Sequence, residues 1–137
     1  MADSIMDILE KYRTLAVVGL SSKPSRPSYG VSAYMLSQGY RIIPVNPNEE
    51  SVLGQKACPS LDEVRELVEV VVIFRRSEYV PEIVESAIRK QAKVVWMQEG
   101  VINQKAANNA QQVGLTVIMD RCMKKEHERI VGEATST

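Results

Sequence analysis

The sequence predicts an α/β fold: a Rossmann-like, doubly wound parallel sheet of about five strands in a three-layer α/β/α arrangement. Two observations predict it. Five short apolar runs, rich in valine and isoleucine, alternate along the chain with segments of helical spacing. Runs of this kind are typical of parallel strands that are buried on both faces. The length of 137 residues suits one domain, so we expect residues 1–137 to form a single domain.

The first four expected elements follow one another closely. We expect an amphipathic helix at 1–12, with its isoleucines and leucine inward, and a strand at 15–20 with the sequence LAVVGL. Apolar residues at helical spacing before a glycine predict a helix at 29–39. The run YRIIPVN predicts a strand at 40–46. Its Pro44 lacks a backbone N–H, which favours an irregular or late position over a central ladder site.

The middle of the chain predicts a short helix, a strand and a longer helix. Ser60, followed three residues later by Glu63, predicts a capping box at the start of a short helix over 59–67. The run VEVVVIF predicts a strand that ends at Phe74. A longer helix is expected at 77–91, because Ser77 is a favourable N-cap and the valines and isoleucines that follow form one buried face.

Strand and helix alternate again towards the C-terminus. The run AKVVWMQ predicts a strand at 92–98, and we expect its Trp96 in the core rather than stacked on a ligand. A helix is expected at 103–114 and a fifth strand at 115–120. The residues that follow are polar, and we expect the tail from about residue 126 to be loose.

Composition argues against several classes of protein. The 17 basic residues balance 17 acidic ones, whereas binders of nucleic acid or of membrane surfaces are usually strongly basic. No apolar stretch approaches the roughly 20 residues that span a bilayer, and no signal-peptide pattern opens the chain. The sequence has one histidine and no Cys-x-x-Cys, so no zinc site is expected. We therefore expect a cytoplasmic protein with a small-molecule ligand and no metal.

Basic side chains follow several of the expected strands. Because parallel strands end at one edge of the sheet, the residues after each strand are expected to gather there. They include Lys23, Arg26, Arg75, Arg76 and Arg121. A group of cations in a chain of zero net charge indicates a polyanionic ligand. The alternative is that these are ordinary solvated loop charges.

The loop SSKPSR after the first strand is a candidate phosphate site without a glycine fingerprint. Gly19 permits a tight exit from the strand, and the backbone N–H groups of Ser21, Ser22 and Lys23 are placed to point at an anion. The helix that begins near Ser28 adds its positive end. The alternative is an ordinary turn with Ser28 as the helix N-cap.

The second loop argues against a common NAD domain. Such domains carry G-x-G-x-x-G after the first strand and an acidic residue at the end of the second, which binds the ribose hydroxyls. Here the glycine motif is absent, and Asn46 and Pro47 stand at the second position. An NAD(P)-binding redox sensor is therefore disfavoured but stays open as an alternative.

Four segments carry a resemblance to a known family. They are AVVGLSSKPSRPSYGVSAYMLSQGYRIIPVNPN, VVVIFRRSEYVPEIVESAI, KVVWMQEGV and MDRCMK. In this order they resemble the small single-domain coenzyme A-binding proteins, whose fold is similar to the CoA-binding domain of the succinyl-CoA synthetase α subunit. The resemblance covers about residues 10–125. One departure is Glu69, where the family often has Asp; it stands at the start of a strand, away from the proposed site.

The resemblance implies a Rossmann-like domain that holds CoA, or an acyl-CoA, across its strand ends. By motif match it implies three groups of contacts. The phosphates would contact Gly19, Ser21, Ser22, Lys23 and Arg26. The adenine or ribose side would contact Val45, Asn46 and Pro47. Further walls of the site would come from Phe74, Arg75 and Arg76 and from Gln98, Glu99 and Gly100. CoA carries on the order of three to four negative charges, which the basic strand ends suit.

The resemblance implies binding without catalysis of its own. The synthetase uses other domains and a phosphorylated histidine, whereas the single histidine here, His127, lies in the polar tail. An enzyme or subunit that uses acyl-CoA with a partner chain is the alternative. At the strand ends only Glu99, Asp120 and Cys122 are candidates for chemistry. Asp120 is interpreted as a cap or ion-pair partner.

Cys122 supports a separate hypothesis. It follows the fifth strand beside Arg121, with two lysines close behind, and nearby cations favour the reactive thiolate form of a cysteine. Cys122 is therefore a candidate for a mixed disulfide with the thiol of CoA. The alternative is a small residue that fills the end of a strand.

Overall fold

A computed structural model describes residues 4–135, with side chains through residue 133. The five main strands and the two short ones are β1 (Thr14–Val18), β2 (Arg41–Val45), β3 (Ser51–Val52), β4 (Gln55–Lys56), β5 (Val70–Ile73), β6 (Val94–Met97) and β7 (Thr116–Ile118). The α-helices are α1 (Ile5–Lys11), α2 (Pro27–Ser37), α3 (Val80–Arg89), α4 (Gln104–Gln112) and α5 (Met123–Thr135). Two 3-10 turns are η1 (Leu61–Glu63) and η2 (Ser77–Tyr79).

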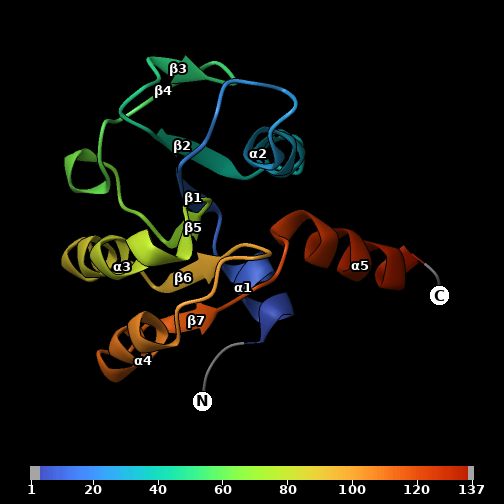
Figure 1. The fold of residues 1–137 in the computed structure, drawn as a ribbon. Coiled ribbons are helices and arrows are strands. Elements are labelled where there is room, and N and C mark those ends of the chain that lie inside the picture. The colour runs from blue at the N-terminus through green and yellow to red at the C-terminus, as the bar shows by residue number, and fades with distance from the viewer. Residues whose placement is uncertain (1–3, 136–137) are drawn as a thin grey trace.

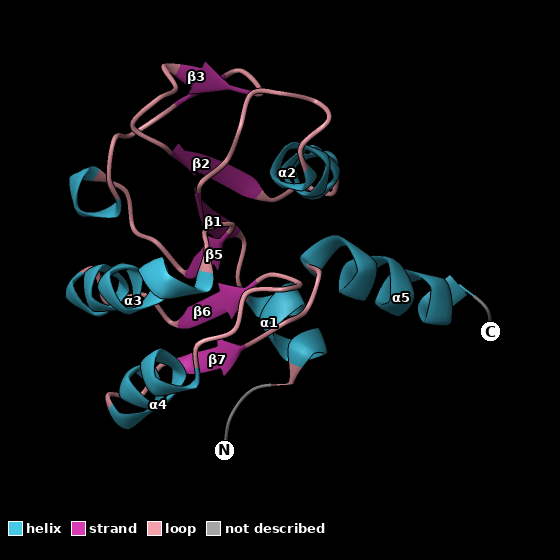
Figure 2. Cartoon of the chain, in the orientation of Figure 1, coloured by secondary structure: helices cyan, strands magenta, loops and turns pink. Residues whose placement is uncertain are grey.

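The main sheet has five strands in the order β2-β1-β5-β6-β7, and every pair in it is parallel. Helices cover both faces: α3 and α4 lie on one side, and α1, α2 and α5 on the other (Figures 1 and 2). The strand order reverses beside β1, since the chain moves outward to β2 and then returns to β5. The predicted doubly wound α/β fold is confirmed.

The core divides into two clusters, one on each face of the sheet. Successive residues of a strand point to opposite faces, so the side chains of β1 alternate between the two clusters. Ala16 and Val18 pack beneath α3 and α4, while Leu15 and Val17 pack beneath α1 and α2. Trp96 is fully buried and donates from Nε1 to the carbonyl of Arg121 at 2.8 Å. Its prediction as a core residue is confirmed.

The edge strand β2 accommodates the proline. Pro44 pairs in register with Val17 on one side, and on the other its carbonyl accepts the N–H of Cys58 at 2.9 Å. An edge position needs fewer backbone donors than a central one, which is why proline is tolerated here. The small antiparallel pair β3-β4 follows β2 and was not predicted.

The two expected caps, and the cap at Ser28 that was the alternative for the first loop, differ in the structure. Ser60 makes no side-chain cap bond, and only the 3-10 turn η1 follows it. Ser77 opens η2 rather than an α-helix, and its Oγ accepts the N–H of Ile102 at 2.9 Å. Arg26, and not Ser28, is the N-cap residue of α2. In each case the serine hydroxyl is either without a cap bond or bonded to a residue outside its own helix.

The expectation of a loose tail from about residue 126 is wrong for the described residues, because helix α5 continues to Thr135. Its buried side rests on α2. Met123 is 1% exposed, and His127 Nδ1 lies 2.7 Å from the hydroxyl of Tyr34. The first three residues of the helix expected at 1–12, and residues 136–137 of the tail, lie outside the described part.

The described residues contain no helix that is long and apolar enough to cross a membrane. Within residues 4–135 no group of three or more His, Cys, Asp or Glu side chains is arranged to hold a metal ion.

Candidate functional site

A cavity of about 590 Å³ lies at the carboxyl ends of β1, β5 and β6. This is the edge of a doubly wound sheet where ligands bind, next to the point where the strand order reverses. The cavity contains ten residues of the predicted site and the candidate thiol. Its lining is Gly19, Ser21, Lys23, Arg26, Pro27, Ser28, Val31, Phe74, Arg75, Arg76, Gln98, Glu99, Gly100, Val101 and Cys122.

Gly19 sets the floor of this cavity. Its φ of +89° is a conformation that side chains disfavour, and its N–H donates to the carbonyl of Val45 at 2.8 Å. A Cβ placed on Gly19 would stand 2.6 Å from the carbonyl oxygen of Phe74 and 3.1 Å from Cδ of Arg75. The chain can therefore leave β1 and pass close to the end of β5 only because position 19 has no side chain.

The backbone of the first loop differs from the expectation. Its N–H groups were expected to point at an anion, but each donates to a protein oxygen. Ser21 donates to Oγ of Ser28 at 3.0 Å, Ser22 to the carboxylate of Glu49 at 2.8 Å, and Lys23 to Oγ of Ser21 at 3.1 Å. The loop is thus held in one shape by its own hydroxyls and by a carboxylate from the loop after β2.

The side chains of the same loop supply the charge. Lys23 and Arg26 are exposed at the cavity, and no carboxylate within the described residues forms an ion pair with either. Pro27 and Ser28, the first residues of α2, also line the cavity, so the positive end of an 11-residue helix faces it. Unpaired cations beside a helix N-terminus form a site for an anion.

The two arginines after β5 are placed differently. The guanidinium of Arg75 lies over the ring of Tyr79, 4.7 Å from its centroid. Arg76 has only a distant ion pair with Glu78, at 3.9 Å, and that pair is largely exposed. Arg121, expected among these cations, is directed elsewhere: it donates to the carbonyl of Asp120 at 3.1 Å and does not line the cavity.

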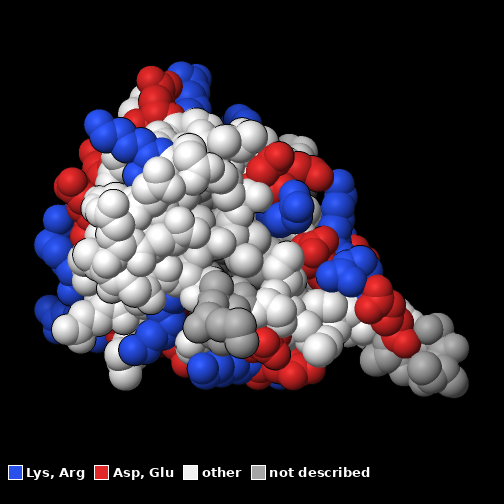
Figure 3. Space-filling model, turned by 90° about the horizontal axis from the view of Figure 1, so that it is seen from below, with Lys and Arg blue, Asp and Glu red and all other residues white. Residues whose placement is uncertain are grey.

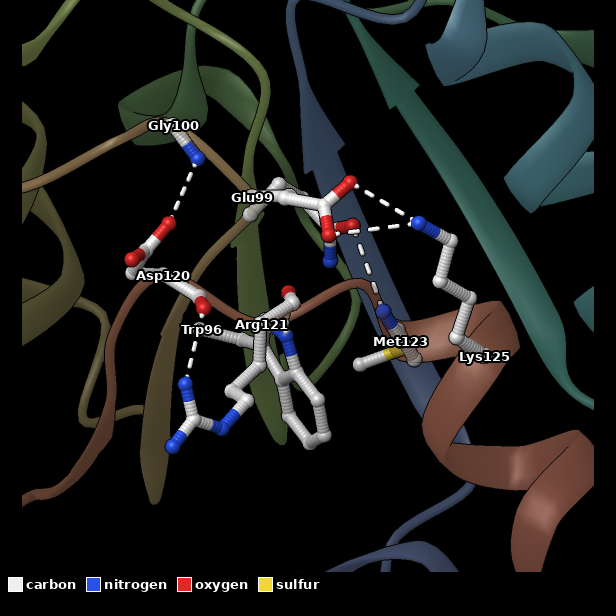
Figure 4. A network of polar contacts seen from close by, with 8 residues as sticks. Trp96, Glu99, Gly100, Asp120, Arg121, Met123 and Lys125 are labelled. Carbon is white, nitrogen blue, oxygen red and sulfur yellow. Dashed lines mark hydrogen bonds and ion pairs between the residues drawn. The ribbon is translucent and has the colours of Figure 1, made fainter.

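The far end of the cavity is closed by a network around the start of α5 (Figure 4). The N–H of Gly100 donates to Asp120 at 2.7 Å, which ties the loop after β6 to the loop after β7. Lys125 bonds both carboxylate oxygens of Glu99 at 3.1 and 3.2 Å, and this contact holds the pKa of Lys125 above its ordinary value. Asp120 was interpreted as a cap or ion-pair partner, but its carboxylate instead accepts a backbone N–H from another loop.

A second hollow, of about 330 Å³, adjoins the first through Arg75, which lines both. Val45 and Pro47 line this second hollow, and so does the ring of Tyr79. Asn46 has another use: its Nδ2 donates to the carbonyl of Leu20 at 3.0 Å, and its Oδ1 accepts the N–H of Asn48 at 3.0 Å. Asn46 thus fixes the two loops at this edge to each other.

Sequence reasoning missed several residues of the two hollows. Val31 and Val101 form apolar wall in the first, and Tyr79 supplies the aromatic surface of the second. Tyr79 stands only three residues after Arg76, within the strand-end segment RRSEY, so its position was a usable signal. The contact of Glu49 with Ser22 spans 27 positions and had no local signal.

Charge is mixed on the face of the molecule that is seen from below. On the face seen from below, basic and acidic side chains are interspersed around the margin of a broad area that carries neither (Figure 3). No single basic patch covers this face (Figure 3).

Comparison with known proteins agrees with this geometry. The sequence matches the family described as "CoA binding domain" over residues 13–128. It is 44% identical over 123 residues to the protein YneT of Bacillus subtilis (strain 168), and the aligned stretch covers 90% of this chain and 91% of YneT. A solved structure of a hypothetical protein from Pyrococcus horikoshii OT3 superimposes with a TM-score of 0.90 at 43% identity, over 93% of this chain and 89% of that one.

A larger enzyme shares part of the sequence. Over 96 residues the chain is 30% identical to the alpha subunit of acetate–CoA ligase [ADP-forming] I from Pyrococcus furiosus. The match covers 66% of this chain but only 21% of that subunit.

Proposed function

Because the chain belongs to the CoA-binding domain family, we propose that it binds coenzyme A, or an acyl-CoA, at the carboxyl ends of its strands and performs no catalysis of its own. The observation that carries this proposal is the main cavity with Lys23 and Arg26 at its edge. Neither cation has a carboxylate partner among the described residues. A polyanion supplies the missing counter-charge.

The phosphates are assigned to the first loop and the residues after β5. Lys23 and Arg26 reach them from the loop, Arg76 from the facing wall, and the start of α2 adds its positive end. Charged hydrogen bonds of this kind contribute about 1.5–3 kcal/mol each. The backbone amides, already bonded within the protein, shape the loop and leave the charge to the side chains.

The two ends of CoA are assigned to the two hollows. Val45, Pro47 and Tyr79 offer a largely apolar surface for the adenine. The pantetheine arm then follows the main cavity towards Gln98, Glu99 and Cys122. Arg75, which lines both hollows, stands between the adenine and the arm.

The similarity to the acetate–CoA ligase subunit favours a second candidate, a CoA-binding part of an acyl-CoA enzyme completed by a partner chain. The two candidates differ in turnover. Purified protein incubated with acyl-CoA and ATP, alone, is expected to release no product; product formed by the chain alone would reject the proposal that it only binds.

Calorimetric titration of charge variants with CoA tests the proposed site. Lys23→Ala and Arg26→Ala are each expected to weaken binding by about 1–3 kcal/mol without unfolding the chain. Lys93→Ala is the matched control, because Lys93 is an exposed cation just before β6, at the opposite edge of the sheet. Equal affinity in all three variants would place the phosphates elsewhere.

A further inference from the structure

We propose that Cys122 is a modification site for the thiol end of CoA, at which a bound CoA disulfide exchanges into a protein–CoA mixed disulfide. The inference rests on the proposed function, since CoA must occupy the main cavity. It goes further by assigning a covalent step and a residue to the far end of that cavity.

Cys122 packs against the core cluster that contains Trp96 and Met123, and it also borders the main cavity. Its thiol is free and only half-buried, and the residue lines the main cavity together with Gln98 and Glu99. It immediately precedes α5, and its carbonyl accepts the N–H of Glu126 at 3.0 Å. The backbone at this position is therefore held by the first turn of the helix. The alternative interpretation, a filler at a strand end, accounts for the core contacts of Cys122 but not for its place in the lining of the cavity.

Gln98 provides an independent sign of a ligand at the same place. It lines the cavity with only 3% of its surface exposed, and its Oε1 accepts the N–H of Met123, the residue after Cys122, at 3.3 Å. Its Nε2 is buried and has no hydrogen-bond partner. A buried donor without an acceptor is costly, by about 1–3 kcal/mol, so this end of the cavity calls for an acceptor oxygen.

The pantetheine arm carries such an oxygen close to its sulfur. In the amide nearest the thiol, the nitrogen is joined to the sulfur by two CH2 groups, so the carbonyl is separated from the sulfur by one N–H and two CH2 groups. A CoA molecule that places this carbonyl at Nε2 of Gln98 brings its sulfur into the neighbourhood of Cys122. The free donor and the free thiol therefore select the same chemical group, an amide followed by a thiol or disulfide.

The step is a thiol–disulfide exchange. The Cys122 thiolate attacks one sulfur of CoA disulfide, a new S–S bond joins Cys122 to that CoA, and the old S–S bond breaks. The second CoA leaves as a thiolate, and the proton lost by Cys122 passes to it or to solvent. CoA disulfide is the oxidant, so no other electron acceptor is needed.

Two single-cysteine variants, each treated with CoA disulfide or with oxidised glutathione, test the proposal. Cys58→Ser leaves only Cys122, and Cys122→Ser leaves only Cys58, which is also free and half-buried but lies beside the edge strand β2, outside the main cavity. Each reduced variant is mixed with CoA disulfide or with oxidised glutathione, and adducts are followed by intact mass. With CoA disulfide, Cys58→Ser is expected to gain one CoA about tenfold faster than Cys122→Ser, because binding brings the reacting sulfurs together. With oxidised glutathione that preference should disappear.

Titration of the reduced wild-type protein with CoA separates this inference from the proposed function. If CoA binds and the CoA disulfide labels both cysteines at the same rate, or labels neither, the exchange at Cys122 is rejected and the binding proposal stands. If CoA does not bind at all, the binding proposal itself fails. A preference for Cys122 that is equally large with oxidised glutathione would show general thiol reactivity and would also overturn the inference.

Discussion

Replacement of Gly19 by alanine is expected to destabilise the protein through two separate terms. The residue has φ +89°, and holding an alanine in such a conformation costs about 1–2 kcal/mol. The added Cβ would stand 2.6 Å from the carbonyl oxygen of Phe74, which belongs to the backbone and cannot swing away. Forcing a methyl group into a packed site costs about 1–3 kcal/mol more. Together the terms predict a loss of about 2–5 kcal/mol.

Urea denaturation followed by circular dichroism measures this loss, with Gly30→Ala as the matched control. Gly30 lies within α2, and its Cβ would meet nothing within 4 Å. Alanine in a helix is favoured over glycine by roughly 0.5–1 kcal/mol, so the control is expected to be slightly more stable than the wild type. The two substitutions are chemically identical and should change stability in opposite directions.

A loss below about 0.5 kcal/mol in Gly19→Ala, within the usual range of surface changes, would contradict the close packing proposed at this position. It would mean that the ends of β1 and β5 can separate freely. The floor of the main cavity would then not depend on the close approach at position 19.

Three further changes have defined outcomes. Asn103→Ala removes the side-chain cap of α4 and should lower the free energy of unfolding in urea by about 1 kcal/mol. Burial of the imidazole and, to a smaller extent, the charge of Arg13 hold the pKa of His127 below its ordinary value. As the pH is lowered, the unfolded chain therefore takes up a proton at this histidine before the folded chain does. The free energy of unfolding should fall as the pH drops through about 6.5. His127→Gln should flatten that dependence in melts between pH 7 and pH 5; an unchanged slope would assign it to other groups. Glu49→Gln keeps an acceptor for the Ser22 N–H but removes a negative charge beside the first loop. The affinity for CoA should therefore rise roughly twofold, and more at low salt. A calorimetric titration that shows weaker binding would contradict this.

The sheet could be predicted because its signal is local. Each buried strand is an apolar run, and each of the five expected runs overlaps one strand of the sheet, although the strands end one or two residues earlier than the runs. In the first run, Gly19 and Leu20 already lie beyond the end of β1. Helix α5 was missed because its overall composition is polar. Its inward residues Met123, His127 and Ile130 do recur at helical spacing, but their burial depends on packing against other helices.

The site could be predicted to the extent that topology determines it. Parallel strands end at one edge, so the residues that follow β1, β5 and β6 had to gather there, and most of the expected residues line the main cavity. Hydrogen bonds between distant loops could not be predicted in this way. The carboxylate of Glu49 on Ser22 and the side chain of Asn46 on Leu20 depend on how two loops meet in three dimensions.

Titration calorimetry of the wild-type protein with CoA and, separately, with NAD shows whether the main cavity is a CoA site. Asn46 stands where NAD domains place the acid that binds ribose, and it is committed to the backbone, while the cations of the main cavity suit the additional phosphate of CoA. We expect saturable binding of one CoA per chain, weaker binding of dephospho-CoA, and no measurable heat with NAD. Binding of NAD without binding of CoA would contradict this expectation.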